Sequence, residues 1–548
     1  MEKKIDGQIY SQMIMGGASV LGSHSGEVDD LNVFPIPDGD TGTNMLQTIE
    51  GGANVDGEEI DLSKESNRIA EAMLLNARGN SGVILSQFFA GIAGGLEGVH
   101  EADVDALIKA FKSGVESAYK SVFKPTEGTI LTVMREATQI ASESGAKTPE
   151  EFFDNFIKAA EESLIHTPDL LPVLKKAGVV DSGGAGLIYI IKGMRRALAG
   201  ESFARNEKKA EKAEELDLDA FDENSVLEFG YCTELLLRLQ KAKTNIDTFE
   251  VSTIISYLET IGDSIVAVKN GSIVKIHVHT MTPDKVLSFC QQFGEFLKIK
   301  IENMSLQHNN TELPSADEEE LTTHIEKELS ELAIVAVANG EGIKEAFMEM
   351  GANVIVDGGQ SMNPSTEDFL KAFDEAHARK ILVFPNNSNI ILAAQQAASI
   401  YKKSEVRVVN SKTIGDGYAA LSMLDTDGDL DTIVEGCMEA MAGVLTAEIS
   451  QCVRNAEFDE ISVSIGDYIG FMGKNILSCS KNRLDATLKT IDELNLKEHE
   501  ICIIIRGEDS NDEECEQIEN YVSKNYPRAE VFFIDGGQHI YSYIIVAE

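Results

Sequence analysis

The stretch NVFPIPDGDTGTNM, residues 32–45, holds the densest group of chemically active side chains in this sequence. Asp38 and Asp40 stand two residues apart, with a glycine between them, in a loop that also contains two prolines. Hard oxygen ligands at this spacing suit Mg²⁺, which prefers one or two carboxylates together with waters and phosphate oxygens. Thr41 to Asn44 then open a helix, whose free N–H groups attract phosphate. We therefore expect a magnesium and phosphate site here.

Two further glycine-rich segments share this design, because each directly precedes an apolar helical stretch. GNSG at 79–82 precedes VILSQFFAGI, and DSGGAG at 181–186 precedes LIYIIKGMRRAL. A lone D-x-D motif favours a capping turn or a Ca²⁺-like loop. Three glycine-rich helix starts in one helical block favour a shared phosphate site instead. The sequence contains neither a P-loop motif nor the protein-kinase motif set.

The chain of 548 residues predicts two to four domains. Two charged stretches, at 201–223 and 309–331, have too little apolar area to anchor a core and are expected to be linkers. They leave domains at 1–200, 224–308 and 332–548. Apolar residues at helical spacing predict an all-α first domain, with helices over 69–75, 83–96, 104–122, 130–144, 150–163 and 187–199.

The other two blocks mix helices and strands. In the middle block we expect helices at 233–241 and 282–292 and strands at 264–268 and 273–279, which makes it α/β. In the last block, runs of β-branched residues starting at Ala333, Ala352, Lys380 and Val406 alternate with amphipathic helices. That alternation is typical of a mostly parallel sheet. DGGQ follows a strand at 357–360 and again at 535–538, which hints at two related lobes.

Charge and composition exclude several classes of partner. The formal net charge of -44 disfavours nucleic acid and anionic membrane surfaces, since both bind through clustered Lys and Arg. No stretch has the roughly 20 apolar residues that a membrane span needs, and no signal peptide is evident. The seven scattered cysteines indicate reduced thiols. We expect a cytoplasmic protein without direct membrane insertion.

The segment IVKIHVH at 273–279 alternates like a half-buried strand. Val274, Ile276 and Val278 would face a core, and His277 and His279 would share the other face, with Cα atoms roughly 6.6 Å apart. Cys232 could add a third ligand, since one Cys and two His with an open position fit catalytic Zn²⁺. The alternative is a polar strand face with Cys232 as a small buried residue.

The three glycine-rich segments, in this order and at this spacing, resemble the ATP-binding domain of dihydroxyacetone kinases. The resemblance covers nearly all of the first 200 residues and implies a closed barrel of antiparallel helices that holds Mg-ATP at one end. It implies metal ligands at Asp38 and Asp40 and nucleotide or phosphate contacts at Thr41, Thr43, Asn44, Asn80, Ser81, Gly82, Thr129 and Asp181. The sequence departs from the family at two positions. Asn32 lies near the family's third metal carboxylate and would be a neutral ligand of the Mg²⁺ ion, and Thr41 stands where those kinases often have His.

The remaining domains resemble those of fatty acid kinase catalytic subunits. GYCTE at 230–234, GDS at 262–264 and KIHVHT at 275–280 are similar to their middle domain, in which the cysteine and two histidines form a metal-bearing catalytic site. GGQSMNPS at 358–365 resembles the DegV-like fatty-acid carriers, and PNNSN at 385–389 also follows a strand. The resemblance implies ATP-dependent phosphorylation of a fatty acid on a separate DegV-like carrier protein, which gives an acyl-phosphate for phospholipid synthesis. It also implies a homodimer and carrier docking on the last domain.

Two other functions are compatible with these motifs. One is a kinase of a small hydroxyketone or polyol, although the dihydroxyacetone-binding module with its substrate-linked histidine is not evident. The other is a nucleotide- or lipid-binding regulator without catalysis. The joint presence of the carboxylate pair and the Cys/His set argues against a pure binding protein.

Overall fold

The computed structural model describes residues 4–32, 39–57, 59–203, 231–240, 243–244, 249, 251–258, 260–270, 273–303, 329–359, 363–426, 428–458 and 461–548. They form two compact units, one made of Met1–Asn206 with Glu328–Glu548 and one of Glu207–Lys327. Most of the two expected linkers, 204–223 and 309–328, lies outside the described residues. Within the described part, no helix is both long and apolar enough to cross a membrane.

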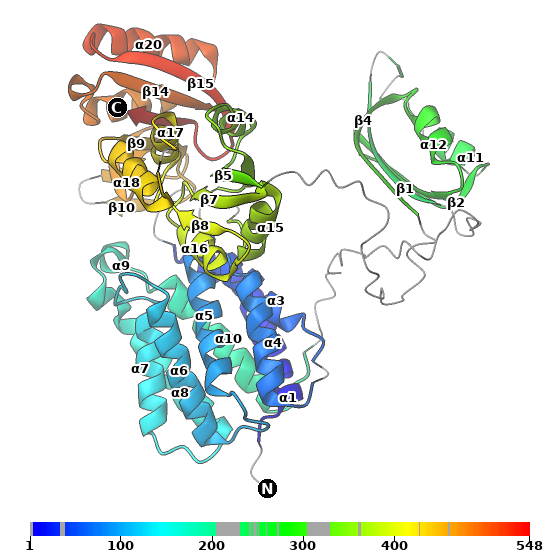
Figure 1. Cartoon of the computed structure of the whole chain (residues 1–548), viewed down its shortest axis with the longest axis vertical. Coiled ribbons are helices and arrows are strands. Elements are labelled where there is room, and N and C mark those ends of the chain that lie inside the picture. The colour runs from blue at the N-terminus through cyan, green and yellow to red at the C-terminus, as the bar shows by residue number, and fades with distance from the viewer. Residues whose placement is uncertain are drawn as a thin grey trace. The chain divides into compact units, whose positions relative to one another are not determined.

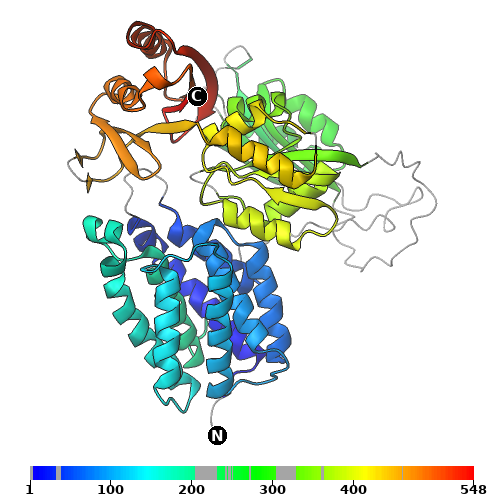
Figure 2. The same ribbon diagram turned by 60° about the vertical axis from the view of Figure 1, so that its left-hand side comes forward.

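The first domain is all-α, as predicted. Its helices are α1 (Gly7–Gly22), α2 (Ser25–Asp30), α3 (Thr41–Ala53), α4 (Leu62–Leu75), α5 (Gly79–Gly95), α6 (Val104–Lys120), α7 (Ile130–Glu143), α8 (Pro149–Leu170), α9 (Pro172–Ala177) and α10 (Ser182–Leu198). The long helices pack side by side in both views (Figures 1 and 2). Asp6, Asp61 and Asp103 start α1, α4 and α6 with side-chain caps on free backbone N–H groups.

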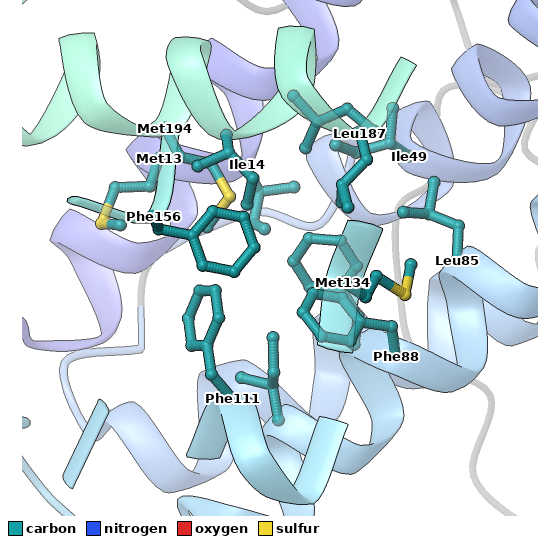
Figure 3. Packing of buried hydrophobic residues seen from close by; sticks show 14 of the residues in the cluster. Met13, Ile14, Ile49, Leu85, Phe88, Phe111, Met134, Phe156, Leu187 and Met194 are labelled. Carbon is teal, nitrogen blue, oxygen red and sulfur yellow. The ribbon is translucent and has the colours of Figure 1, made fainter. Parts of the chain in front are cut away.

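Aromatic side chains fill the middle of this helical domain. Phe111 lies edge to face with Phe88, Phe152 and Phe156, at ring-centroid distances of 5.6, 5.1 and 5.4 Å. Figure 3 shows Phe88, Phe111 and Phe156 among aliphatic and methionine side chains from several helices. Because this interior is apolar, we look for the polar groups that could bind a ligand at the ends of the helices.

The middle domain contains one antiparallel sheet with strand order β2-β3-β1-β4. Its elements are β1 (Tyr231–Leu239), α11 (Ser252–Leu258), β2 (Gly262–Asn270), β3 (Ile273–Thr280), α12 (Pro283–Cys290) and β4 (Gly294–Asn303). The helix predicted at 233–241 is wrong, because this segment is strand β1. Its leucines suggested a helix, but β1 pairs with a strand on each side and buries Leu235, Leu237 and Leu239 with a period of two.

The last domain begins with a four-stranded parallel sheet, as predicted. The strands are β5 (Ser330–Ala338), β6 (Val354–Asp357), β7 (Ala378–Phe384) and β8 (Glu405–Val408), in the order β6-β5-β7-β8. They alternate with α14 (Glu341–Glu349), α15 (Thr366–Ala376) and α16 (Ile391–Ile400), and α17 (Ile414–Ser422) and α18 (Leu430–Met441) follow. The loops after β6 and β7 are GGQSMNPS and PNNSN.

The rest of this domain differs from the predicted parallel pattern. A six-stranded sheet has the order β13-β12-β9-β16-β14-β15, and only the β14–β15 pair is parallel. Its elements are β9 (Leu445–Gln451), β12 (Tyr468–Met472), β13 (Asn475–Ser480), α19 (Arg483–Glu493), β14 (Ile501–Gly507), α20 (Asp512–Asn525), β15 (Glu530–Gln538) and β16 (Tyr543–Ala547). A short hairpin joins β10 (Ala456–Phe458) and β11 (Ile461–Val463), and η2 (Leu496–Glu498) follows α19. The first DGGQ segment begins at the last residue of β6 in the parallel sheet, whereas the second forms the end of β15 in the six-stranded sheet. The two segments therefore do not mark a repeated fold.

Candidate functional site

The three glycine-rich helix starts meet around the first turns of α3. Gly79, which has φ +58°, lies so close to Asn44 that a Cβ there would be 2.5 Å from the Asn44 Nδ2 atom. A Cβ at Gly82 would collide with the Thr48 hydroxyl, and one at Gly186 would be 2.7 Å from the sulfur of Met45. Glycine is required at these positions because each backbone approaches a neighbouring helix. The tertiary structure thus brings together the three segments singled out in the sequence.

Asn32 connects the first and third of these segments. Its Oδ1 atom accepts hydrogen bonds from Thr41 Oγ1 at 3.2 Å and from Ser182 Oγ at 3.4 Å. Asp40 stands at the N-cap of α3, where its side chain does not cap the helix. Asp38 lies outside the described residues. Asn32, Thr41 and Asp40 therefore surround the start of α3, and Asn44 and Gly82 are buried beside them.

Asp29, which the sequence analysis missed, holds the N-terminus of α3. Its carboxylate accepts hydrogen bonds from the Gly42 N–H at 2.6 Å, the Thr43 N–H at 3.2 Å and the Thr43 hydroxyl at 2.8 Å. A phosphate that took these donors would have to displace this carboxylate, since the two anions compete for the same positive helix end. The sequence signal was weak, because Asp29 precedes the motif in a separate short helix.

Asp181 ties the starts of α7 and α10 together. Its carboxylate accepts a hydrogen bond from the Gly184 N–H at 2.7 Å and a second one from the backbone N–H of Ile130. Desolvation raises the pKa of the Asp181 carboxyl from 3.8 to about 6, because it outweighs these two hydrogen bonds. Thr129, the residue before α7, uses its hydroxyl to donate to the Thr126 carbonyl at 2.7 Å. Both predicted residues thus lie at helix starts, and Asp181 acts there as a cap.

The C-terminal domain contacts the same end of the helical domain, which the sequence analysis did not anticipate. Asn80 donates to Asn389 Oδ1 at 3.2 Å and to the Ser388 carbonyl at 3.4 Å. The side-chain amide of Asn363 donates a hydrogen bond to the Asp40 carboxylate. The two loops that follow β6 and β7 therefore both reach the glycine-rich helix starts, and they lie at the carboxyl ends of parallel strands, where such sheets bind ligands.

Ser81, another residue expected to bind phosphate, lies in the first turn of α5. It is half-buried, next to the contact that Asn80 makes with the PNNSN loop. Its position in the first turn places it where backbone N–H groups have no partner within the helix. Ser81 is therefore at the same end of the helical domain as the other predicted phosphate ligands.

A small cavity lies at the same edge of the C-terminal sheet. Its volume is about 60 Å³, and residues of both DGGQ segments and of the PNNSN loop line it. At ~10–15 Å³ per water, this space holds only a few water molecules. Glu448 and Lys412 add one charge of each sign to the lining. The lining of this small cavity therefore carries charges of both signs.

In the middle domain, the backbone register places the predicted Cys/His set on neighbouring strands. Cys232 in β1 is directly opposite His279 in β3, and Glu234 is opposite His277. Residues directly opposite each other in an antiparallel pair belong to the same face of the sheet. Asp263 in β2, which belongs to the GDS segment, is paired with His279 from the other side.

The opposite face of β3 is buried, as its alternation predicts. Val274, Ile276 and Val278 are fully buried in the core of the middle domain. The Cys/His positions are therefore on the face that does not form this core. This register is compatible with a site shared by β1 and β3.

Comparison with protein-family models assigns each domain. The C-terminal domain of FakA-like fatty acid kinases matches residues 333–548, and the middle domain of the same family matches residues 228–311. The DAK2 domain matches residues 35–196. An uncharacterised protein of Staphylococcus aureus (strain USA300) is 38% identical over 561 residues, which cover 100% of both chains, and its counterpart in strain MRSA252 is equally similar.

Solved structures are similar to parts of the chain. The native form of the dihydroxyacetone kinase of C. freundii is 16% identical and covers 40% of this chain and 48% of its own, with a TM-score of 0.30. DegV, a fatty acid binding protein from Bacillus subtilis, is 12% identical and covers 40% of this chain and 99% of its own, also with a TM-score of 0.30. The family assignment rests on the domain models and on the full-length relatives: the chain belongs to the FakA-like fatty acid kinase family, and its domains are those of a kinase-like phosphotransferase.

Proposed function

We propose that this protein transfers the γ-phosphate of ATP to the carboxylate of a fatty acid that a separate carrier protein presents. The observation that carries the proposal is the meeting of three glycine-rich helix starts, Asn32 and Asp40 at one end of the helical domain. Backbone N–H groups at helix starts bind phosphate, and glycines allow the close approach that this binding needs. The family assignment supports a kinase-like reaction at this end.

The residues present fit a magnesium ion. Asn32 and Asp40 offer hard oxygen atoms beside the start of α3, and Asp38 belongs to the same segment. Among the described residues, the buried Oδ1 atom of Asn363 has no hydrogen-bond partner, and it belongs to the side chain that contacts Asp40. Such a set of oxygens suits Mg²⁺, which keeps several waters and few protein ligands. When bound, Mg²⁺ would neutralise negative charge on the phosphates.

The phosphoryl transfer itself needs no general base. A carboxylate oxygen of the fatty acid attacks the γ-phosphorus, the bond from this phosphorus to the bridging oxygen breaks, and ADP leaves. No proton has to be removed, because the carboxylate is already ionised at neutral pH. We assign phosphate binding to Thr41, Asn44, Asn80, Ser81 and Gly82, and to Thr43 once the phosphate displaces Asp29 from its N–H and hydroxyl. We place the nucleotide near Thr129 and Asp181. These groups position the phosphates and exclude water, which is the main demand of phosphoryl transfer.

The acyl chain would remain on its carrier during the reaction. The cavity in the C-terminal domain is small, with a volume of about 60 Å³. The net charge of -44 also disfavours direct extraction of fatty acids from an anionic membrane. We therefore propose a DegV-like fatty-acid-binding partner that docks on the C-terminal domain, with the acyl-phosphate serving phospholipid synthesis.

We propose a second site at Cys232, His277 and His279, with Zn²⁺ as the metal. The register that puts Cys232 opposite His279, with His277 two residues along the same strand, supports this set. One thiolate and two imidazoles leave a fourth position open, which is typical of catalytic rather than structural zinc.

The proposed function is tested by Mg²⁺-dependent ATP consumption with three acceptors: oleate on a DegV-like carrier, free oleate, and dihydroxyacetone. Turnover that requires the loaded carrier is expected. Turnover with dihydroxyacetone alone would instead identify a small-molecule kinase, and ATP binding without any transfer would identify a regulator. Asp40→Ala should abolish turnover, because it removes the carboxylate expected to bind the metal, so full activity in this variant would contradict the nucleotide site.

A further inference from the structure

We infer that Asn363, in the C-terminal domain, is a positioning residue of the magnesium–nucleotide site. The inference rests on the proposed function, because it takes Asp40 as a ligand of Mg²⁺. It goes further by making the C-terminal domain a structural part of the nucleotide site, in addition to its proposed role in docking a carrier.

The backbone around Asn363 is paired with the residues that lead into the GNSG segment. The Thr366 N–H donates to the Ala77 carbonyl at 3.2 Å, and Ser365 forms an antiparallel bridge with Arg78. The guanidinium of Arg78 donates to the Asn363 carbonyl at 2.6 Å and lies 3.5 Å from Asp368. Backbone and side-chain contacts therefore hold this segment of the C-terminal domain against the residues that precede α5.

The side chain of Asn363 is held in one orientation. It is only 2% exposed, and its Nδ2 atom donates to the carboxylate of Asp40. Because a carboxylate only accepts hydrogen bonds, the amide atom that contacts Asp40 is the nitrogen Nδ2. The oxygen Oδ1 of Asn363 therefore remains as an acceptor. This Oδ1 atom is buried and has no partner among the residues that the structure describes. A buried acceptor is costly to leave unpaired, and a hydrated Mg²⁺ carries water molecules that donate.

A side chain that orients a metal ligand acts as its outer-shell partner. Such partners typically change metal affinity by ~10–100-fold when they are removed. Asn363 fits this role with both of its polar atoms, because Nδ2 fixes the Asp40 carboxylate and Oδ1 offers an acceptor next to it. Arg454, from another part of the C-terminal domain, contacts the residues between α2 and α3. Its guanidinium donates hydrogen bonds to the carbonyls of Asp30 and Asn32.

The contact between the two domains does not depend on Asn363 alone. Ala77 and Val83 are buried in one apolar cluster with Phe369, Ile390 and other residues of the C-terminal domain. Gln87 also donates to Gln396 at 3.0 Å. The loss of the Asn363 amide should therefore change the metal site and leave the domains in contact.

The test compares full-length wild type, Asn363→Ala and Gln87→Ala in their binding of a non-hydrolysable ATP analogue by calorimetry, at a series of Mg²⁺ concentrations. Gln87→Ala is the matched control, because it removes an interdomain hydrogen bond that does not touch Asp40. We expect Asn363→Ala to raise the Mg²⁺ concentration needed for half-maximal binding by about tenfold or more. Gln87→Ala should bind like the wild type, and all three proteins should melt at similar temperatures.

A wild-type Mg²⁺ dependence in Asn363→Ala would overturn the inference, and so would tighter binding, since that would mark the contact as inhibitory. If Gln87→Ala raised the Mg²⁺ concentration needed for half-maximal binding by the same factor, Asn363 would be only an interdomain contact, and the inference would be overturned too. Asn363→Ser, which is too short to reach Asp40, replaces the alanine variant if the latter melts early. Asp40→Ala separates the two proposals: unchanged Mg²⁺ dependence in that variant would refute the metal assignment itself, independently of Asn363.

Discussion

The desolvated cap Asp181 predicts a pH-dependent cost to the stability of the helical domain. Its carboxyl has a pKa raised by desolvation from 3.8 to about 6. Because the pKa is raised in the folded state, this carboxyl contributes most to the free energy of unfolding below pH 3.8, where it is protonated. The contribution is lost as the pH rises through about 6. At pH 7.5 the ionised carboxylate therefore destabilises the fold relative to its protonated form.

The size of this cost follows from the pKa change. Each tenfold change in proton affinity corresponds to about 1.4 kcal/mol, so a rise from 3.8 to about 6 corresponds to about 3 kcal/mol. Asp181→Asn removes the charge and keeps one oxygen for the Gly184 N–H, but it loses the hydrogen bond from Ile130, worth about 1 kcal/mol. The variant should therefore be more stable than the wild type by about 2 kcal/mol at pH 7.5. This advantage should vanish below about pH 4, where both side chains are neutral.

Thermal unfolding of the nucleotide-free protein between pH 4 and pH 8 measures this difference. A gain of about 2 kcal/mol corresponds to a rise of roughly 4–8 °C in the transition of a domain of this size. Asp103→Asn is the matched control, because Asp103 caps α6 through the Ala106 N–H from an exposed position. A stability difference between Asp181→Asn and the wild type that stays constant with pH would refute the reasoning, as would the same pH trend in the control.

Three further changes probe the phosphate loop, the core and the second site. Gly79→Ala should cost about 1–2 kcal/mol for its left-handed backbone and should also weaken nucleotide binding, because its Cβ would lie 2.5 Å from Asn44 Nδ2. Gly94→Ala in the same helix has open space around the new Cβ and should be neutral or stabilising in the same melting and binding assays. Phe111→Ala should lower stability by about 3–5 kcal/mol, and a small change in denaturant unfolding would contradict the packing in Figure 3. His277→Ala should lose bound zinc in elemental analysis without unfolding the helical domain, and well-folded wild type without any metal would eliminate that site.

Local patterns in the sequence were sufficient to predict many of the helices and strands. The helices from α4 to α8 and α10 carry apolar residues at helical spacing, and the strands β5 to β8 are short β-branched runs between amphipathic helices. The error at 233–241 shows the limit of such patterns. The leucines of this segment suit a helix or a strand, and the pairing with β3 and β4 settled which of the two forms.

The candidate site divides in the same way. The segments that carry phosphate and metal chemistry could be found in the chain, because glycine-rich helix starts and closely spaced carboxylates are local features. The alternation that buries Ile276 and places His277 on the other face of β3 is local too. In contrast, no local pattern revealed that Asp29 holds the start of α3, or that Asn363 reaches Asp40 from 323 residues away. These hydrogen bonds join groups that become neighbours only when the helices and the two domains pack, and such packing leaves no periodic signal in the chain.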